Sequence, residues 1–223
     1  MIALVNPKSA NWGFRVPNSL LTLGAFLEGR YDYTIIDENL GVTAVNGLVK
    51  LIQNGVKYIG ITVMPAMQLR GAYQISREIK TRFPEIKIIW GGYFPSMHPN
   101  TVLKSPYIDF VLKGHAEYSF IELLDSLEVK PGAKALNQIA GLSFKHDGLI
   151  SHNVKAEPID PDLIPRLPYH KVDVDKYLNF GKTYLGPRTI GYHSSVGCPF
   201  LCGFCAVAGI YKGKWLGRSA ELT

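Results

Sequence analysis

Cysteine is almost absent from this chain of 223 residues, and residues 1–197 contain none. All three cysteines lie between positions 198 and 205. An odd number of cysteines, crowded into one short segment, argues against a framework of disulfide bonds. This absence excludes the class of small secreted proteins that disulfides hold together, and the crowding itself calls for a chemical explanation.

Long apolar runs are also missing. No apolar stretch approaches the roughly 20 residues that cross a bilayer, and the apolar start at Ile2–Val5 ends at Asn6-Pro7. This start has neither the charged region nor the small-residue cleavage site of a signal peptide, and it fits a buried first strand better. We therefore expect a cytoplasmic protein without a membrane span.

Charge of one sign is only in modest excess, since 24 Lys and Arg against 18 Asp and Glu give a net charge of +6. The basic residues are scattered, and the nearest thing to a cluster is Lys212, Lys214 and Arg218, next to the cysteines. Such scatter indicates solvated helix faces rather than a patch for nucleic acid. Nucleic acid is therefore not an expected partner.

What the first 130 residues do contain is an alternation of short apolar runs with helical patterns, typical of a parallel sheet covered by helices. The spacing of apolar residues predicts helices over residues 20–27, 45–52, 67–83 and 117–127. The expected strands are Ile2–Val5, Tyr33–Ile36, Tyr58–Val63, Ile86–Trp90 and Asp109–Leu112.

This order of elements predicts an α/β fold, a flavodoxin-like doubly wound parallel sheet with strand order 2-1-3-4-5. Right-handed crossovers bring the carboxyl ends of the strands to one edge, where ligands of such sheets bind. In the loops at that edge, Met64 and Met67 are interpreted as packing residues, and His98 and His115 as surface histidines. The loops are expected at residues 6–18, which include Gly13, and at 64–68, 91–100 and 114–118.

The pattern changes after residue 135. Residues 139–154 favour a β-hairpin that turns at Asp147-Gly148, and five prolines over residues 155–187 indicate a linker. A new strand is expected at Thr189–Ser194, directly before the cysteines. The sequence therefore predicts three parts: an α/β domain over residues 1–135, a hairpin and proline-rich linker over 136–188, and the start of another domain over 189–223.

Cys198, Cys202 and Cys205 have the spacing C-x3-C-x2-C on one loop. Thiolates are the soft ligands that iron–sulfur clusters require, and three of them leave the fourth iron of a 4Fe–4S cube open to a small molecule. A structural zinc site would need a fourth ligand, for which His193 is the only nearby candidate. Three inert, buried thiols are the other alternative. The spacing favours the cluster.

This loop resembles that of radical S-adenosylmethionine (SAM) enzymes, and Trp215–Glu221 is similar to the segment after the cysteine loop in many members. The resemblance implies that the cysteines bind three irons, that the open iron chelates SAM, and that Phe204 lies near the adenine. Reduction of the cluster would then cleave SAM to a 5′-deoxyadenosyl radical. It also implies a barrel after Thr189, of which this sequence holds only the first β/α element, so we expect the chain alone to be catalytically incomplete.

The front of the chain, over most of residues 1–180, resembles the cobalamin-binding domain that precedes the barrel in one large subgroup of these enzymes. Five segments carry this resemblance: residues 17–27, 59–62, 89–96, 109–117 and 139–144. It implies a flavodoxin-like sheet of the cobalamin-binding type, followed by an incomplete radical SAM barrel. The implied cofactor-binding residues are Thr62, Gly91, Gly92, Tyr93, Gly114 and Glu117.

Two features depart from these relatives. The sequence has no D-x-H-x-x-G run, so the histidine that binds cobalt from below in cobalamin mutases and methionine synthase has no counterpart, and the lower ligand is unknown. Residues 114–117 read Gly-His-Ala-Glu where members often have Gly-Glu-Gly-Glu. Only Gly114 and Glu117 therefore match the motif of these relatives.

The combined resemblance favours a cobalamin-dependent radical SAM enzyme, most simply a methyltransferase. Such an enzyme takes a small-molecule substrate and an electron donor such as flavodoxin or ferredoxin; its catalytic residues are not identifiable in this sequence. A methylthiotransferase would hold a second cluster through cysteines in its front domain, and residues 1–197 have none. The alternative is a flavodoxin-like module that binds cobalamin or flavin, with a structural metal loop and no radical catalysis.

Overall fold

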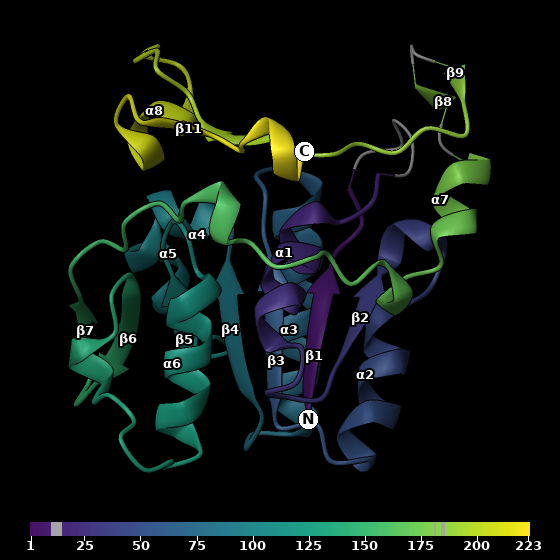
Figure 1. The fold of residues 1–223 in the computed structure, drawn as a ribbon. Coiled ribbons are helices and arrows are strands. Elements are labelled where there is room, and N and C mark those ends of the chain that lie inside the picture. The colour runs from purple at the N-terminus through teal and green to yellow at the C-terminus, as the bar shows by residue number, and fades with distance from the viewer. Residues whose placement is uncertain (10–14, 181, 184–185) are drawn as a thin grey trace.

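The computed structural model describes residues 1–9, 15–180, 182–183 and 186–223. Its main body is a seven-stranded sheet in the order β2-β1-β3-β4-β5-β6-β7, with helices on both faces (Figure 1). The first five strands run parallel, which confirms the predicted α/β fold and the predicted order 2-1-3-4-5. Their bounds are β1 Ile2–Asn6, β2 Tyr33–Asp37, β3 Tyr58–Thr62, β4 Lys87–Gly91 and β5 Phe110–Leu112.

The strands are mostly apolar because the sheet is covered on both faces, as parallel sheets are. On one face, α2 (Ala44–Gln53) and α3 (Met67–Arg82) pack against side chains such as Val5 and Ile59. On the other face, α1 (Asn18–Leu27) and α6 (Glu117–Leu127) pack against Leu4 and Ile89. All four helices agree with the sequence prediction to within about two residues. Gly13, in the first predicted loop, lies outside the described residues.

The predicted hairpin is present as β6 (Leu142–His146) and β7 (Leu149–His152), with its turn at Asp147-Gly148. The hairpin is part of the main sheet, because β6 pairs antiparallel with β5 and so adds two strands to its edge. The sequence did not predict this pairing. The domain boundary at residue 135 stays a prediction.

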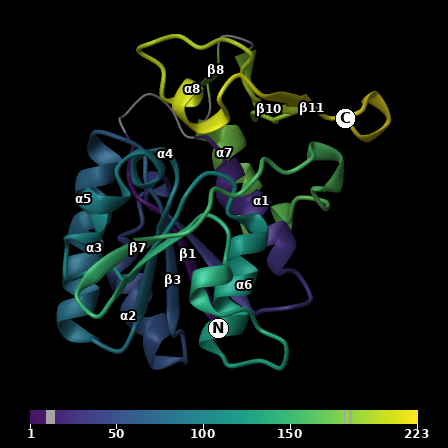
Figure 2. The same ribbon diagram turned by 90° about the vertical axis from the view of Figure 1, so that its left-hand side faces the viewer.

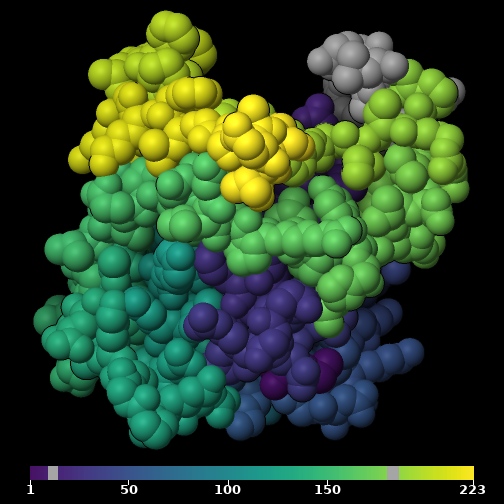
Figure 3. Space-filling model, in the orientation of Figure 1, coloured from purple at the N-terminus to yellow at the C-terminus, as the bar shows by residue number. Residues whose placement is uncertain are grey.

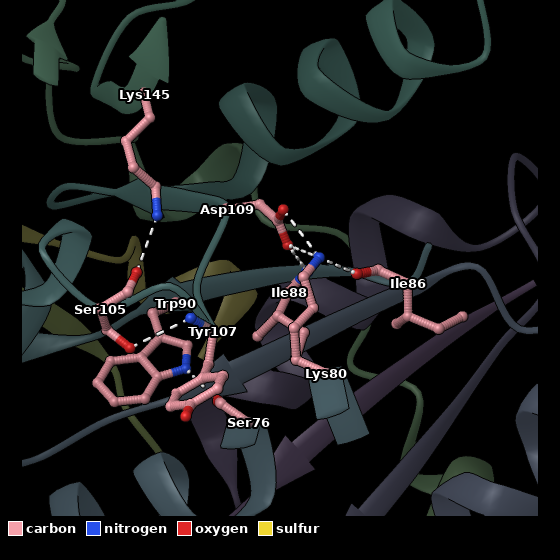
Figure 4. Close-up of polar contacts among 9 residues, drawn as sticks. All are labelled: Ser76, Lys80, Ile86, Ile88, Trp90, Ser105, Tyr107, Asp109 and Lys145. Atoms are coloured by element: carbon pink, nitrogen blue, oxygen red, sulfur yellow. Dashed lines mark hydrogen bonds and ion pairs between the residues drawn. The ribbon is translucent and has the colours of Figure 1, made fainter. Parts of the chain in front are cut away.

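A group of polar contacts ties α3 to the amino ends of β4 and β5 (Figure 4). The ammonium of Lys80 donates to both carboxylate oxygens of Asp109, at 2.9 and 2.8 Å, and to the carbonyl of Ile86. Asp109 also accepts from the backbone N–H of Ile88. On the same helix, the hydroxyl of Ser76 accepts from the indole of the buried Trp90 at 2.9 Å. The contacts of Lys80 and Asp109 fix the end of the sheet that lies opposite the ligand edge, whereas Trp90 lies one residue before the carboxyl end of β4.

Three short helices occur where the sequence predicted only loop or linker. The loop after β4 forms α4 (Tyr93–Met97) and α5 (Pro99–Leu103), the latter with proline in its first turn, where proline is favoured. The linker forms α7 (Val174–Phe180). Further one-turn 3-10 helices lie at Glu38–Leu40, Leu136–Gln138, Pro161–Leu163, Tyr169–Lys171 and Ala220–Leu222.

The C-terminal segment lies across the carboxyl edge of the sheet (Figures 1 and 2). In it, β10 (Ser195–Gly197) pairs antiparallel with β11 (Trp215–Gly217), and α8 (Ala206–Tyr211) lies between them in sequence. A second short pair, β8 (Lys182–Thr183) with β9 (Gly186–Pro187), precedes them.

The strand predicted at Thr189–Ser194 was wrong, because these residues have no regular structure. A strand needs a neighbour for its backbone groups, and the described residues offer these groups other partners. The carbonyl of Gly191 accepts from the side-chain amide of Asn18, and that of Ser194 from the backbone N–H of Arg218. Among the described residues, no helix is long and apolar enough to cross a membrane.

Candidate cofactor site

A cavity of about 1110 Å³ separates the carboxyl edge of the sheet from the C-terminal segment. Its floor is formed by the ends of β3, β4 and β5, and its walls by residues of α1, by the loop before α3 and by residues 189–193. Figure 3 shows the C-terminal residues, in yellow, seated on the rest of the molecule at this edge. The volume is slightly above the range of about 300–1,000 Å³ that is common for small-molecule sites.

The floor of the cavity is kept open by glycines. Gly92 has φ +97°, and a Cβ built there would lie 2.9 Å from the backbone nitrogen of Val63. Only glycine fits both the torsion and the contact. Ser96 then links two loops, because its hydroxyl donates to the carbonyl of Gly92 and accepts from the backbone N–H of Gly114.

Gln68 fixes the wall that follows β3. Its side-chain amide donates to Asn6 Oδ1 at 2.8 Å and to the carbonyl of Pro7, and it accepts from the backbone N–H of Met64. Ala66 has φ +68°, a strained torsion for a residue other than glycine. The prediction that Met64 and Met67 pack in the core was wrong, because they are 44% and 53% exposed. Both line the cavity instead.

The opposite wall comes from α8, which packs on α4. Burial raises the pKa of Tyr211 to about 12, and nearby Tyr93 and Glu117 add to this effect. Burial also raises the pKa of Tyr93, with a further contribution from Cys205. Both tyrosines are therefore neutral hydroxyl groups at pH 7. The ammonium of Lys155 donates to the carbonyl of Ile210 and so holds the end of α8.

Among the described residues, only four buried side-chain atoms lack a hydrogen-bond partner: Asn18 Oδ1, Arg218 Nε and both ring nitrogens of His115. All three residues line the cavity. The side chain of His115 is 11% exposed, and Nδ1 lies 3.6 Å from Glu117 Oε2, which is beyond hydrogen-bond distance. The prediction that His115 is a surface histidine was therefore wrong. His98 is exposed, as predicted.

The cavity brings together six of the residues that the resemblance implied. These are Thr62, Gly91, Gly92, Tyr93, Gly114 and Glu117. Phe204 is not among the lining residues and is 94% exposed. Sequence reasoning did not single out Asn18, Ser96 or Gln68. Asn18 and Ser96 lie within segments that carried the resemblance, and this signal could have identified them.

The three cysteines all lie in the described part of the chain. Cys202 is exposed, whereas Cys198 and Cys205 are partly buried. Backbone bonds shape the loop, since Cys198 N–H donates to the carbonyl of Lys214 and Cys205 N–H to that of Cys202. Within the described residues, no three His, Cys, Asp or Glu side chains gather closely enough to hold a metal ion. The cluster therefore stays a prediction that rests on the chemistry of three thiolates.

The donor set at the cavity fits cobalamin. Glycines along the floor leave space for a wide, flat ring to approach the backbone, and at Gly114 an added Cβ would meet nothing within 4 Å. The unpaired atoms of Asn18, His115 and Arg218 offer hydrogen bonds to a ligand with many amide groups. Tyr93 and Tyr211 supply further hydroxyl groups.

Comparison with known proteins agrees with this site. Residues 15–124 match the family model of the B12 binding domain. Over 99% of its length, the chain is 27% identical to the anaerobic magnesium-protoporphyrin IX monomethyl ester cyclase of Synechocystis. Over 92%, it is 29% identical to an uncharacterized methyltransferase of Pyrococcus horikoshii. The matched regions are 44% and 43% of those two proteins, so the chain spans less than half of their length.

Two solved structures share the fold. OxsB, a cobalamin-dependent SAM radical enzyme, matches 99% of this chain with a TM-score of 0.77 and 23% identity, over 30% of its own chain. TsrM, a radical SAM methyltransferase from Kitasatospora setae, matches 98% with a TM-score of 0.66 and 19% identity, over 43% of its own. The fold and the cavity thus define an α/β domain of the B12-binding type. Residues 15–124 are thus similar to the B12 binding domain, and the chain shares the fold of these two radical SAM enzymes.

Proposed function

We propose that this chain binds cobalamin in the cavity at the carboxyl edge of its sheet. The observation that carries this proposal is the coincidence of site and sequence: six residues implied by the resemblance line one cavity, inside the stretch that matches the B12 binding domain. Gly92 and Gly114 admit the ring to the backbone, and Thr62 and Tyr93 face it with hydroxyl groups. Bound cobalamin supplies a cobalt centre that carries a methyl group.

We further propose that Cys198, Cys202 and Cys205 hold a 4Fe–4S cluster that binds SAM and supplies the electron for its reductive cleavage. The segment that carries these cysteines packs beside the cavity through α8 and α4, and this supports neighbouring sites for the two proposed cofactors. With further chain that completes a barrel, the protein would act as a methyltransferase on a small molecule. Flavodoxin or ferredoxin would deliver the electron to the exposed cysteine loop.

Anaerobic reconstitution with iron and sulfide tests the cluster. We expect the reduced protein to give the electron paramagnetic resonance (EPR) signal of a 4Fe–4S cluster, and the signal to shift when SAM is added. Cys202→Ser should abolish it, because two thiolates cannot retain the cluster. A signal that does not respond to SAM would favour the alternative, a structural metal loop beside a cobalamin site.

A further inference from the structure

The side chain of His115 is the one imidazole that the fold buries at the cavity without giving it a partner. The sequence has six histidines, and all lie in the described residues. Two of them, His115 and His193, line the cavity. His193 is exposed to solvent, whereas both nitrogens of His115 are buried and unpaired. By contrast, both ring nitrogens of His152, an exposed residue, have hydrogen-bond partners, Ser143 and Asn100, at 2.8 Å each.

An unpaired buried imidazole costs free energy. A neutral imidazole has one donor and one acceptor nitrogen, and a buried polar group without a partner loses the hydrogen bonds that water would have given it. Such groups in a native structure call for an explanation, and a ligand is one of the few available. Because the ring lies on the wall of the cavity, a ligand bound there is the partner that can remove this cost.

The surroundings of His115 are those of a metal-binding histidine. Glu117 Oε2 lies 3.6 Å from Nδ1, so a small movement forms the hydrogen bond that fixes the tautomer. Histidines that bind metals usually donate their second ring nitrogen to a carboxylate in this way, which leaves the other nitrogen free for the metal. The ring of Tyr211 meets the imidazole edge-on, with centroids 5.3 Å apart.

We propose that His115, in the loop after β5, is a protein ligand of the cobalt of bound cobalamin. This inference rests on the proposed cobalamin site. It also gives a role to the departure at residues 114–117, where histidine stands at a position that relatives often fill with glutamate. Imidazole nitrogen is a good ligand for cobalt, whereas a carboxylate suits harder metals.

The test is EPR of the full chain loaded with cob(II)alamin, in protein made with and without ¹⁵N-histidine. An axial ¹⁴N ligand splits each cobalt line into three, and ¹⁵N splits it into two. We expect the splitting to change from triplets to doublets in the labelled protein. This comparison separates the protein's histidine from the benzimidazole of the cofactor, which stays ¹⁴N in both samples.

Three variants locate the ligand. In labelled His115→Gln the doublets should disappear, whereas in His193→Gln, which alters the other histidine of the cavity, they should remain. Addition of ¹⁵N-imidazole to His115→Ala should restore them. Thermal melting of each variant checks that it is folded. Each variant is loaded until absorbance shows one corrinoid per chain, so that the spectra compare cobalt ligation and not affinity.

The test distinguishes a failure of this inference about His115 from a failure of the proposed cobalamin site. If the labelled protein binds cob(II)alamin but its spectrum is the same as without the label, His115 is not a cobalt ligand, and the proposed cobalamin site stands. Doublets that persist in His115→Gln would also overturn the inference. If folded protein binds no corrinoid, the proposed function and this inference fail together.

Discussion

Gly92 shows how single residues decide the shape of the cavity. The backbone of Val63 passes so close that an added Cβ would lie 2.9 Å from its nitrogen and 3.0 Å from its oxygen. The carbonyl of Val63 accepts from the backbone N–H of Phe94, which starts α4. A side chain at position 92 therefore disturbs both the floor of the cavity and the helix that α8 rests on.

We expect Gly92→Ala to lower the free energy of unfolding by about 3 kcal/mol, because a positive φ and a backbone clash act together. Gly148→Ala is the matched control, since Gly148 has φ +76° but nothing lies within 4 Å of its added Cβ. It should cost only about 1 kcal/mol. Urea denaturation of the two variants measures both values, and equal losses would show that the contact with Val63 has no effect.

Tyr58 gives a residue-scale prediction about pH. Its hydroxyl donates to Glu128 Oε1 at 2.7 Å, and this bond lowers the pKa of Glu128, with a smaller effect from Lys57. Because the folded pKa lies below the unfolded one, the stabilisation is present above the ordinary glutamate pKa and is lost as the pH falls through the folded pKa. Tyr58→Phe should therefore destabilise the protein at pH 7 but much less at pH 3.

Denaturant midpoints of the wild type and Tyr58→Phe at the two pH values check this prediction. The ring of Tyr58 is buried and is retained in the variant, so the loss of packing is small. A difference between the two proteins that does not shrink on acidification would contradict it.

At the scale of elements, sequence patterns were reliable wherever an element is buried by its own apolar residues. The strands β1 to β5 and the helices α1, α2, α3 and α6 carry continuous apolar runs or apolar faces, and all were predicted. Helices and strand pairings that depend on residues far apart in the sequence were not predicted. The antiparallel pairing of β6 with β5 depends on residues about 30 positions apart, and α7 is held by Tyr177, whose hydroxyl donates to Asp37.

The residues of the candidate site also fall into a group that the sequence predicted and a group that it did not. Motifs at strand ends predicted the six lining residues, because the carboxyl ends of parallel strands meet at one edge. The burial of His115 and the exposure of Met64 and Met67 were not predictable, since both depend on where α8 and the loop before α3 settle. The strand expected at residues 189–194 was wrong in position, because the strand that precedes the cysteines is β10, Ser195–Gly197, whose place is set by its distant partner β11.

Lys80 joins α3 to β5, so its removal is a test at this scale. The side chains of Lys80 and Asp109 are 13% and 20% exposed. A fully buried pair that loses one partner costs about 3–5 kcal/mol, and partial exposure reduces this, so we expect about 2 kcal/mol for Lys80→Met. Lys176→Met, which breaks a half-exposed pair with Asp173, should cost less than about 0.5 kcal/mol. Thermal denaturation compares the two, and similar losses would contradict the role of Lys80.

At the scale of the whole molecule, the cavity exists only because two parts of the chain face each other. Residues 189–218 supply one wall, and the sheet edge supplies the floor. Lys155 and the ion pair of Lys214 with Glu157, at 2.5 Å, tie the C-terminal segment to the residues just after the hairpin. A ligand that fills the cavity therefore contacts both parts and should stabilise the chain as a unit.

Bound cobalamin should raise the midpoint of thermal unfolding. A ligand at 100 times its dissociation constant adds about 2.7 kcal/mol to the free energy of unfolding. Differential scanning calorimetry with increasing hydroxocobalamin measures this effect. We expect one transition that moves to higher temperature as the concentration rises. A midpoint that stays constant would contradict binding to the folded chain.

The most direct test of the account is equilibrium dialysis of hydroxocobalamin against the folded chain, with the bound cofactor measured by its absorbance. We predict one cobalamin per chain, and weakened binding in Thr62→Trp, which places a large ring at the end of β3 on the floor of the cavity. Circular dichroism establishes that both proteins are folded. Absence of cobalamin from the folded wild-type chain, or equal binding by Thr62→Trp, would contradict the site described for this protein.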